Sequence, residues 1–200
     1  MTTPELNRDY NVLRDALLAS GGAVEMSTSS TPATDLNSQN GGFDWEGKDP
    51  NFKDSFGTIA VTHDFGKTVG WQFVQGRDFS RKFSTDSSGI VLNETAVRYM
   101  DLKDPVGKIM KWNGKPFQIV GVVKDMVMGS PFEPVYQTVF MMNYGWANVI
   151  NIKLNPNLST GESLKKIEAV FQKFNPGSPF DYKFSDQEYE RKFLAEERIG

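Results

Sequence analysis

Cysteine is absent from the 200-residue chain, and histidine occurs once, as His63. Without thiols the chain has no disulfide, no thiolate nucleophile and no cysteine-ligated metal centre. One imidazole cannot build a two-histidine metal site, and a catalytic triad would have to use this residue. His63 follows Thr62 at the predicted end of a strand and precedes Asp64. This corner position favours a structural or surface role.

Long apolar runs and blocks of basic residues are also missing. No run approaches the roughly 18 apolar residues that a membrane-spanning helix needs. The first five residues lack the basic and apolar regions of a signal peptide. No basic block exceeds two consecutive residues, so we predict no nucleic-acid partner. The chain itself is predicted to be soluble, and its end within a helical pattern at residues 197–200 suggests a fragment of a longer protein.

The residues that are present can build a folded domain. Apolar residues make up 38% of the chain and aromatic residues 12%, and the net charge is −3. This composition supplies a hydrophobic core, and a chain of this length forms one large domain or two small ones.

Residues 89–125 carry the densest local signals. Residues 89–92 predict a strand, and Asn93 is placed to cap a helix of about two turns that follows. Asp104-Pro105-Val106-Gly107 predicts a turn. Asn113-Gly114 joins two strand-like runs, and this dipeptide favours a tight hairpin because both positions accept positive φ.

Helices and strands alternate on both sides of this stretch. A first helix, capped by Thr3, is followed by strands at 23–27 and 56–62, with a long loop at 28–51 between them and a short helix at 63–69. Later come strands at 135–143 and 147–154, a helix after the capping box 159–162, a strand at 179–184 and a last helix after a second capping box at 185–188. The order predicts an α+β sandwich split by an insertion near residues 86–130.

A search for chemistry finds no catalytic, cofactor-binding or metal-ligating residue, and we predict no cofactor. Phe65-Gly66-Lys67-Thr68 superficially resembles a phosphate-binding loop, but Val61 occupies the position of the required first glycine. The acidic pairs Asp101 with Asp104 and Glu196 with Glu197 are interpreted as solvated surface. The oxygen-bearing set Asp35, Asn37, Asn40 and Asp44 misses the spacing of a calcium loop.

Seven aromatic residues in the middle of the chain leave two interpretations open. They line a groove, or, as their spacing favours, they belong to the core. They are Trp71, Phe73, Trp112, Phe117, Phe132, Tyr136 and Phe140.

Four short motifs, in this order and spacing, resemble the MacB-like periplasmic core domain of FtsX-like ABC transporter permeases, and the pattern is most similar to permeases of the Bacteroidetes type. The resemblance extends over essentially the whole chain. The motifs are Gly76-Arg77-Asp78-Phe79, Ile90-Val91-Leu92-Asn93-Glu94-Thr95-Ala96, Asp104-Pro105-Val106-Gly107-Lys108 and Ile119-Val120-Gly121-Val122-Val123-Lys124-Asp125.

The resemblance implies a fold and a location. Residues 1–84 plus 131–200 would form a porter-like subdomain, and residues 85–130 a small inserted subdomain. The domain would lie on the periplasmic face of the inner membrane, between two flanking transmembrane helices of the permease. Residues 28–51 lack an obvious counterpart to the partner-binding element of efflux members, which argues against docking to a pump adaptor.

The resemblance also implies a role without catalysis. A separate ATPase would drive the transmembrane helices, a second permease copy would complete the transporter, and this domain would couple ATP hydrolysis to periplasmic movement for efflux or envelope transport. The terminal helices would then lie side by side. The alternative is a module that binds a peptide or lipid in a cleft flanked by Trp71, Trp112 or Tyr136. Contacts with cargo or partner are expected at exposed loops such as residues 111–115.

Overall fold

The computed structural model describes residues 9–36, 38–126 and 134–188. Its helices are α2 (Tyr10–Ala19), α3 (Phe65–Val69), α4 (Glu94–Tyr99), α5 (Thr160–Phe174) and the 3-10 helix η1 (Ser84–Ser88). Its strands are β1 (Ala23–Ser29), β2 (Gln39–Asn40), β3 (Phe43–Trp45), β4 (Phe56–Val61), β5 (Phe73–Gly76), β6 (Gly89–Asn93), β7 (Ile109–Trp112), β8 (Lys115–Val123), β9 (Thr138–Met142) and β10 (Val149–Leu154). No helix among these residues is long and apolar enough to cross a membrane.

All ten strands belong to one mixed sheet. Its main order is β10-β1-β4-β9-β6-β8-β7-β3, with β2 paired to β4 and β5 paired to β8. The pairs β4/β9 and β6/β8 are parallel, and the other pairs are antiparallel. A mixed sheet with helices confirms the predicted α+β class.

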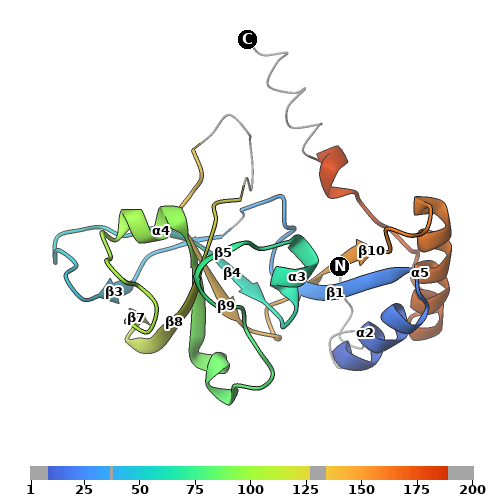
Figure 1. Cartoon of the computed structure of the whole chain (residues 1–200), viewed down its shortest axis with the longest axis horizontal. Helices are drawn as coiled ribbons and strands as arrows, with labels where there is room; N and C mark the ends of the chain where they lie inside the picture. The colour runs from blue at the N-terminus through green and yellow to red at the C-terminus, as the bar shows by residue number, and fades with distance from the viewer. Residues whose placement is uncertain (1–8, 37, 127–133, 189–200) are drawn as a thin grey trace, which may run out of the picture.

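The elements gather at two ends of an elongated molecule (Figure 1). We call α2, β1, β10 and α5 the helical half, and the other elements the strand half. Strand β1 pairs with β10 over its whole length but meets β4 at one register pair, Ser29 with Val61. The backbone therefore joins the two halves over a very short stretch of sheet.

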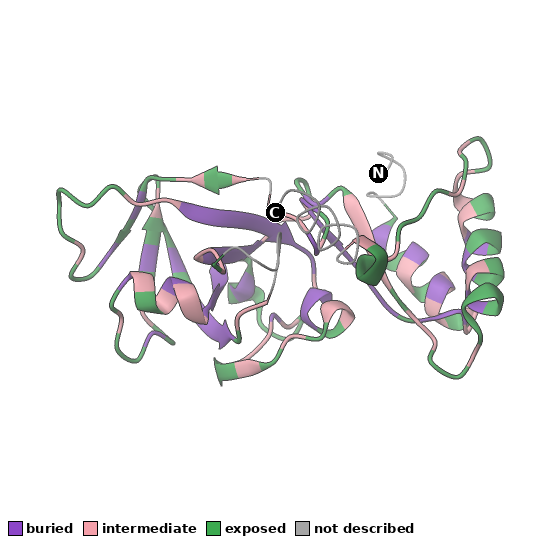
Figure 2. Cartoon of the chain, turned by 90° about the horizontal axis from the view of Figure 1, so that it is seen from above, coloured by how far each residue is buried: buried purple, intermediate pink, exposed green. Residues whose placement is uncertain are grey.

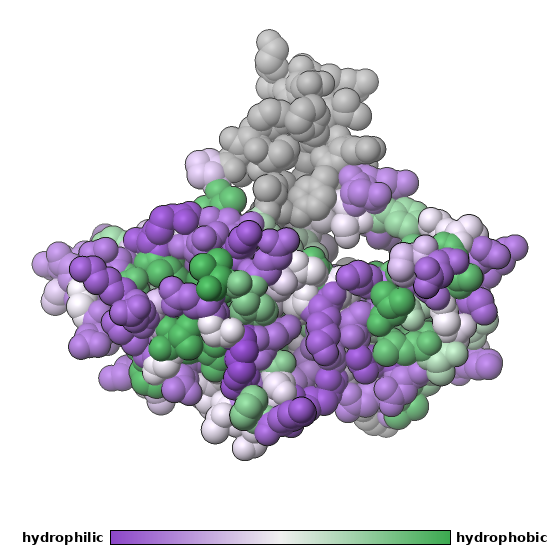
Figure 3. Space-filling view, in the orientation of Figure 1, coloured by the Kyte–Doolittle hydropathy of each residue, from purple (hydrophilic) through white to green (hydrophobic). Residues whose placement is uncertain are grey.

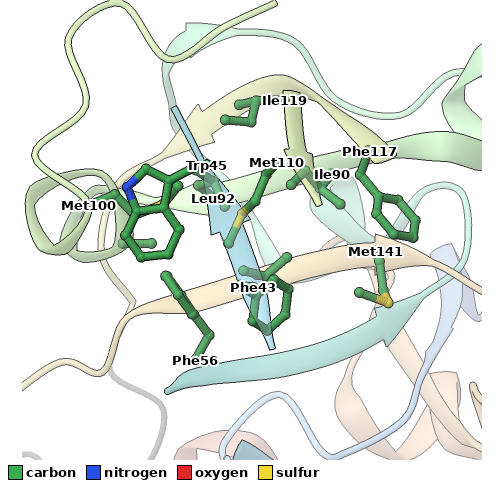
Figure 4. Close-up of a cluster of buried hydrophobic side chains, with 12 residues drawn as sticks. Phe43, Trp45, Phe56, Ile90, Leu92, Met100, Met110, Phe117, Ile119 and Met141 are labelled. Atoms are coloured by element: carbon green, nitrogen blue, oxygen red, sulfur yellow. The ribbon is translucent and has the colours of Figure 1, made fainter. Parts of the chain in front are cut away.

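The strand half encloses two apolar cores. In the first, side chains from β3, β4, β6, β7, β8, β9 and α4 converge between the strands (Figure 4). Phe56 is fully buried in it, with the rings of Phe43 and Trp45 packed edge-on against it at 5.0 and 5.8 Å. In the second, Phe65 of α3 and Phe140 of β9 pack around Trp71. Burial of each such side chain contributes about 1.5–3 kcal/mol.

The helical half has its own apolar core, in which α2 and α5 pack against β1 and β10. Leu13, Leu17, Met26 and Ile167 are almost completely buried there. Figure 2 shows buried segments along the strands of both halves and exposed residues on the outer side of α5. Gly22 permits the close approach of α5, because a Cβ at this position would lie 2.8 Å from the Ser163 carbonyl oxygen.

Local signals in the sequence are confirmed where their partners are near in the chain. Asn93 caps α4, since its Oδ1 accepts from Ala96 N at 2.9 Å. Ser159 and Glu162 form the expected capping box of α5. Asn113 and Gly114 have φ angles of 49° and 80°, as a type I′ hairpin turn requires.

The strand predicted at residues 179–184 is wrong, because this segment has no strand partner. The alternating aromatics pack on one another instead. Phe180 and Tyr182 lie 5.5 Å apart, Tyr182 and Phe184 lie 5.3 Å apart, and Phe171 of α5 supports Phe180 at 5.4 Å. The cap at Thr3 and most of the last helix lie outside the described residues, so the expected pairing of the terminal helices does too.

The division into residues 1–84 plus 131–200 and residues 85–130 stays a prediction. Packing links the two sides of this division closely. Phe43 and Phe56 share one core with Ile90, Met110 and other residues of the predicted insert. Strand β6 also pairs with β9.

Gly121 of β8 lies where the paired strand β5 approaches closely, and its replacement tests how tightly the two strands pack. A Cβ there would lie 2.7 Å from the Phe73 ring and against the Arg77 backbone, whereas a Cβ on Gly161 would meet nothing within 4 Å. We expect Gly121→Ala to destabilise the domain by about 1–3 kcal/mol through overpacking. The matched change Gly161→Ala in α5 should be neutral or stabilising by up to about 1 kcal/mol. Urea denaturation measures both, and equal effects would refute the account.

Candidate functional site

The junction between the halves combines a short run of backbone hydrogen bonds around the Ser29–Val61 pair with polar side chains. Thr28 N donates to Thr62 Oγ1 at 2.8 Å, and Thr62 N donates to the Thr28 carbonyl at 3.0 Å. Met26 N donates to the Glu25 carboxylate at 3.0 Å. These contacts satisfy backbone groups along the edge of β1 that β4 leaves unpaired. Figure 3 shows hydrophilic residues over the middle of this face, where the halves meet.

The hydroxyl of Tyr10 lies at the centre of the junction. It accepts from Thr62 Oγ1 at 3.1 Å and lies 3.3 Å from the Met26 carbonyl and 3.0 Å from the His63 carbonyl, which compete for its proton. Burial raises the pKa of Tyr10 to about 12, so the hydroxyl keeps that proton. The ring of Tyr144 packs edge-on against Tyr10 at 5.1 Å.

Ion pairs surround this hydroxyl. Arg14 of α2 contacts the Glu25 carboxylate at 2.6 Å and Asp64 at 3.3 Å. Asp64 also binds Arg81 and lies 3.7 Å from Lys67. The side chains of Arg14, Glu25 and Asp64 are only 17%, 11% and 8% exposed. Four separate segments of the chain thus meet at shielded charges, which interact more strongly than surface pairs.

Asp64 is held in an unusual backbone conformation. Its φ angle is 69° at the N-cap of α3, in the left-handed region that aspartate tolerates better than most residues. The conformation places its carboxylate between the side chains of Arg14 and Arg81.

A second ion pair fixes the segment that carries Arg81. Arg77 donates two hydrogen bonds to the Asp86 carboxylate, at 2.7 and 2.8 Å. Ser80 N donates to the same carboxylate at 2.7 Å. Burial would raise the pKa of Asp86, but these hydrogen bonds outweigh burial and lower that pKa below its ordinary value.

Asp78 lies partly buried beside α3. It accepts from Phe79 N at 2.7 Å, and it lies beside Gly66 and Trp71, where a Cβ on Gly66 would clash with its carboxylate. Burial raises the pKa of Asp78 to about 6, and the nearby carboxylates of Asp64 and Asp86 add to the rise.

The structural role predicted for His63 fits its surroundings. Its Nδ1 lies 2.6 Å from the Tyr144 hydroxyl, and burial, with the nearby Arg81 charge, lowers its pKa. The sequence Phe65-Gly66-Lys67-Thr68 forms α3, with Phe65 and Gly66 buried, so it presents no phosphate loop.

The acidic candidates form no metal centre in the part of the chain that is described. No group of three or more histidine, aspartate or glutamate side chains there is arranged to hold a metal ion. Asp101 and Asp104 are exposed, as predicted. Asn37, Glu196 and Glu197 lie outside the described residues.

Five of the seven central aromatics lie in or against the two cores of the strand half. Trp71 and Phe73 lie against the second core, and Trp112 stacks on Phe43 at 5.4 Å with an interplanar angle of 8°. The Tyr136 hydroxyl donates to Ser55 Oγ at 2.8 Å. A hollow of about 400 Å³ is lined instead by Tyr182, Lys183, Phe184, Gln187 and Glu188. Phe132 lies outside the described residues.

Sequence reasoning missed the junction because its partners are far apart in the chain. Arg14 and Glu25 are eleven residues apart, and Tyr10 and Thr62 are 52 apart. No local pattern marks such a pair. The position of Asp64 at a strand-to-helix corner was the one available hint.

Comparison with known proteins agrees with this fold. The model of the MacB-like periplasmic core domain matches residues 6–170. The chain belongs to this family. Its expected place, as a periplasmic domain of a MacB-like ABC transporter permease, follows from that membership.

One curated relative of this MacB-like domain is the macrolide export ATP-binding/permease protein MacB of Haemophilus ducreyi. The two are 29% identical over 120 residues, which cover 54% of this chain and 17% of that protein. The chain therefore spans a small part of that relative's length.

Solved structures share the fold at low identity. The periplasmic region of MacB from Actinobacillus actinomycetemcomitans matches with a TM-score of 0.62 and 15% identity, over 90% of this chain and 81% of that chain. The extracellular domain of the noncanonic ABC-type transporter YknZ from Gram-positive bacteria gives 0.58 and 12%, over 90% and 92%. A domain of a putative permease from Porphyromonas gingivalis gives 0.54 and 18%, over 80% and 78%.

Removal of Arg14 tests the contribution of the junction to stability. Arg14→Ala leaves the Glu25 carboxylate shielded without its cation, so we expect a loss of about 2–4 kcal/mol. The matched change Arg98→Ala breaks a 2.8 Å pair with Asp125 in which Arg98 is 64% exposed, and it should cost at most about 1 kcal/mol. Chemical denaturation compares the two, and similar losses would contradict the assigned importance of Arg14.

The raised pKa of Asp78 predicts a pH-dependent effect of its replacement. Because the folded pKa of about 6 lies above the ordinary 3.8, ionisation of Asp78 costs stability as pH rises through this interval. Asp78→Asn keeps the acceptor for Phe79 N and removes the charge. The variant should exceed the wild type by about 1–2 kcal/mol at pH 7.5, after allowance for solvent screening.

This advantage of Asp78→Asn should largely disappear near pH 4, where Asp78 is protonated in the folded protein. Thermal melts across this range measure the difference, and the other titrating groups are common to both proteins. A difference that does not vary with pH would refute the assignment.

Proposed function

We propose that this domain transmits movement in an ABC transporter permease of the MacB-like type, in efflux or envelope transport. Flanking transmembrane helices of the permease would anchor it, a separate ATPase would supply the energy, and a second permease copy would complete the transporter. The domain itself would have no catalytic role. The observation that carries the proposal is the polar junction between two halves with separate apolar cores.

The two halves differ from their junction in the physical character of their contacts. Each half is held by close-packed apolar side chains, and such cores resist deformation. The junction relies instead on the hydrogen bonds and ion pairs of Tyr10, Arg14 and Asp64. Displacement of one half is therefore expected to turn it against the other without unfolding either.

In this proposal, movement of the rest of the permease reaches the domain through helix α2. It carries both Tyr10 and Arg14, so it contacts β1 and the corner at Thr62 to Asp64 at once. A pull on the chain before α2 would reach these contacts first. The ion pair between Arg14 and Asp64 would then carry the force into the strand half.

These 200 residues contain no cysteine, so spin labels can be placed at chosen positions of the domain, in a full-length permease whose other cysteines are replaced. Spin labels on Glu168→Cys in α5 and Lys103→Cys beside α4 would report on the two halves, since both positions are exposed. The distance distribution between the labels should shift when ADP–vanadate traps the assembled transporter. The junction variant Arg14→Ala should broaden the distribution and reduce the shift.

A label pair within one half serves as the control. Lys103→Cys combined with Lys53→Cys, both in the strand half and both exposed, should give the same distribution in both nucleotide states. An unchanged distribution between the halves in both states would refute the transmission proposal.

A further inference from the structure

Among the described residues, strand β10 has a neighbouring strand on one side only. It pairs with β1 and ends the main order of the sheet. Its sequence contains no proline and a single charge, at Lys153. Native proteins usually protect such an edge with charges, proline or a covering segment, because its unpaired backbone groups readily bind another strand. The backbone N–H and C=O groups on the outer side of β10 are therefore open to pairing.

The apolar core of the helical half is incompletely covered beside this edge. Leu13 of α2 and Met26 of β1 are only 0% and 1% exposed in that core. In contrast, the core side chains of β10 and of the end of α5 are only half-buried. They are Ile150, Ile152, Leu154, Phe171 and Phe174. A helix buries its apolar stripe only where a sheet lies beneath it, so this core is one strand short on the β10 side.

Residues 179–184 are a second segment of this end of the chain without a strand partner. The rings of Phe180, Tyr182 and Phe184 follow one another at 5.5 and 5.3 Å, as alternate side chains of an extended chain do. Phe180 also packs on Phe171 of α5 at 5.4 Å and lies against the core of the helical half. The segment is thus held against α5, although it forms no backbone ladder with β10.

The order of the elements indicates which strand is missing. Helix α5 connects β10 to residues 179–184, whereas α2 leads into β1 and has no described strand before it. Both helices cover the same core. In a split βαβ arrangement each helix joins two parallel strands that have one further strand between them. The first strand of the α2 unit would then run parallel to β1 and lie beside β10, antiparallel to it, because β1 and β10 are antiparallel.

We propose that a strand of about five or six residues, from the part of the full-length permease that precedes Met1, pairs antiparallel with the open edge of β10. It would cover the half-buried side chains of β10 and α5, and its far side would face residues 179–184. Residues 1–8 are an unsuitable source, because only Met1 and Leu6 are apolar and Pro4 interrupts the run. Alternate side chains of the added strand should be apolar and face α2 and α5.

Two other occupants fit the edge less well. Residues 179–184 follow α5 closely enough to reach β10, yet they do not pair with it in this structure. A second copy of the chain could pair through its own β10, but both copies of α2 would then still lack a first strand. The proposal does not depend on the transmission proposal, because it rests on the unpaired edge and the open core of the helical half.

Hydrogen exchange read by mass spectrometry tests the pairing in the full-length permease and in the 200-residue chain. The slowest amides of residues 149–154 should exchange at least about tenfold more slowly in the full-length permease, since an added ladder and a closed core protect them. Strand β9 is the internal control, because it already pairs with β4 and β6. Its exchange should be the same in both proteins. Equal exchange of residues 149–154 in the two proteins would overturn the proposal.

A synthetic peptide separates this strand from other sources of protection. The peptide copies about 15 residues that precede Met1 in the full-length permease, enough for one strand and its connection. Added to the 200-residue chain, it should slow exchange of residues 149–154, and a scrambled peptide should not. Ile152→Ala should weaken peptide binding about tenfold, because it removes apolar area that the added strand would cover. The control Val12→Ala changes a side chain of α2 that is 59% exposed and should leave binding unaltered.

The same measurements identify the other occupants. Protection of residues 149–154 that rises with the concentration of the 200-residue chain alone would overturn the proposal in favour of a second copy. Protection that Tyr182→Pro abolishes in the 200-residue chain would overturn it in favour of residues 179–184. Equal effects of the native and scrambled peptides would also contradict it. Melting temperatures establish that the variants fold, and if Ile152→Ala melts early, the two peptides on the unchanged chain carry the test.

Discussion

The carboxylate of Asp64 is the contact on which the arrangement of the two halves depends. It binds Arg14 of the helical half and Arg81 of the strand half, and its own backbone begins α3. Strand β1 meets β4 at a single register pair, so the sheet alone cannot fix the angle between the halves. The orientation therefore rests on shielded charges, which require good geometry to offset the cost of their desolvation.

Within one sheet, the two halves are packed by apolar cores, whereas the junction between them is polar. The apolar cores on either side are closed by side chains such as Phe56 and Leu17, which are fully buried. The junction contains Tyr10, Thr28 and Thr62, whose hydroxyls accept alternative partners. The raised pKa of Asp78 shows that the same region also tolerates an unfavourable charge. Replacement of such a shielded ion pair by well-packed apolar side chains is often neutral or stabilising, so these charges are not explained by stability alone.

The sequence allowed prediction wherever the physical cause lay within a few residues. The Asn93 cap, the Ser159 capping box and the Asn113-Gly114 turn depend on neighbours in the chain, and all three are confirmed. The strand expected at residues 179–184 failed because alternation describes one strand and says nothing about a partner to pair with. The pair of Arg14 with Asp64 was hidden for a related reason, since only the folded sheet brings α2 to the corner before α3.

Arginine provides most of the ion pairs that hold the junction. Arg14 and Arg81 both contact Asp64, and Arg77 contacts Asp86 through two nitrogens. A planar group with several fixed donors suits such contacts. Lysine contributes less at the junction, where Lys67 lies 3.7 Å from Asp64, although Lys48 forms a shielded pair with Asp54 in the strand half. The orientation of the two halves therefore depends mainly on groups whose donors have a fixed geometry.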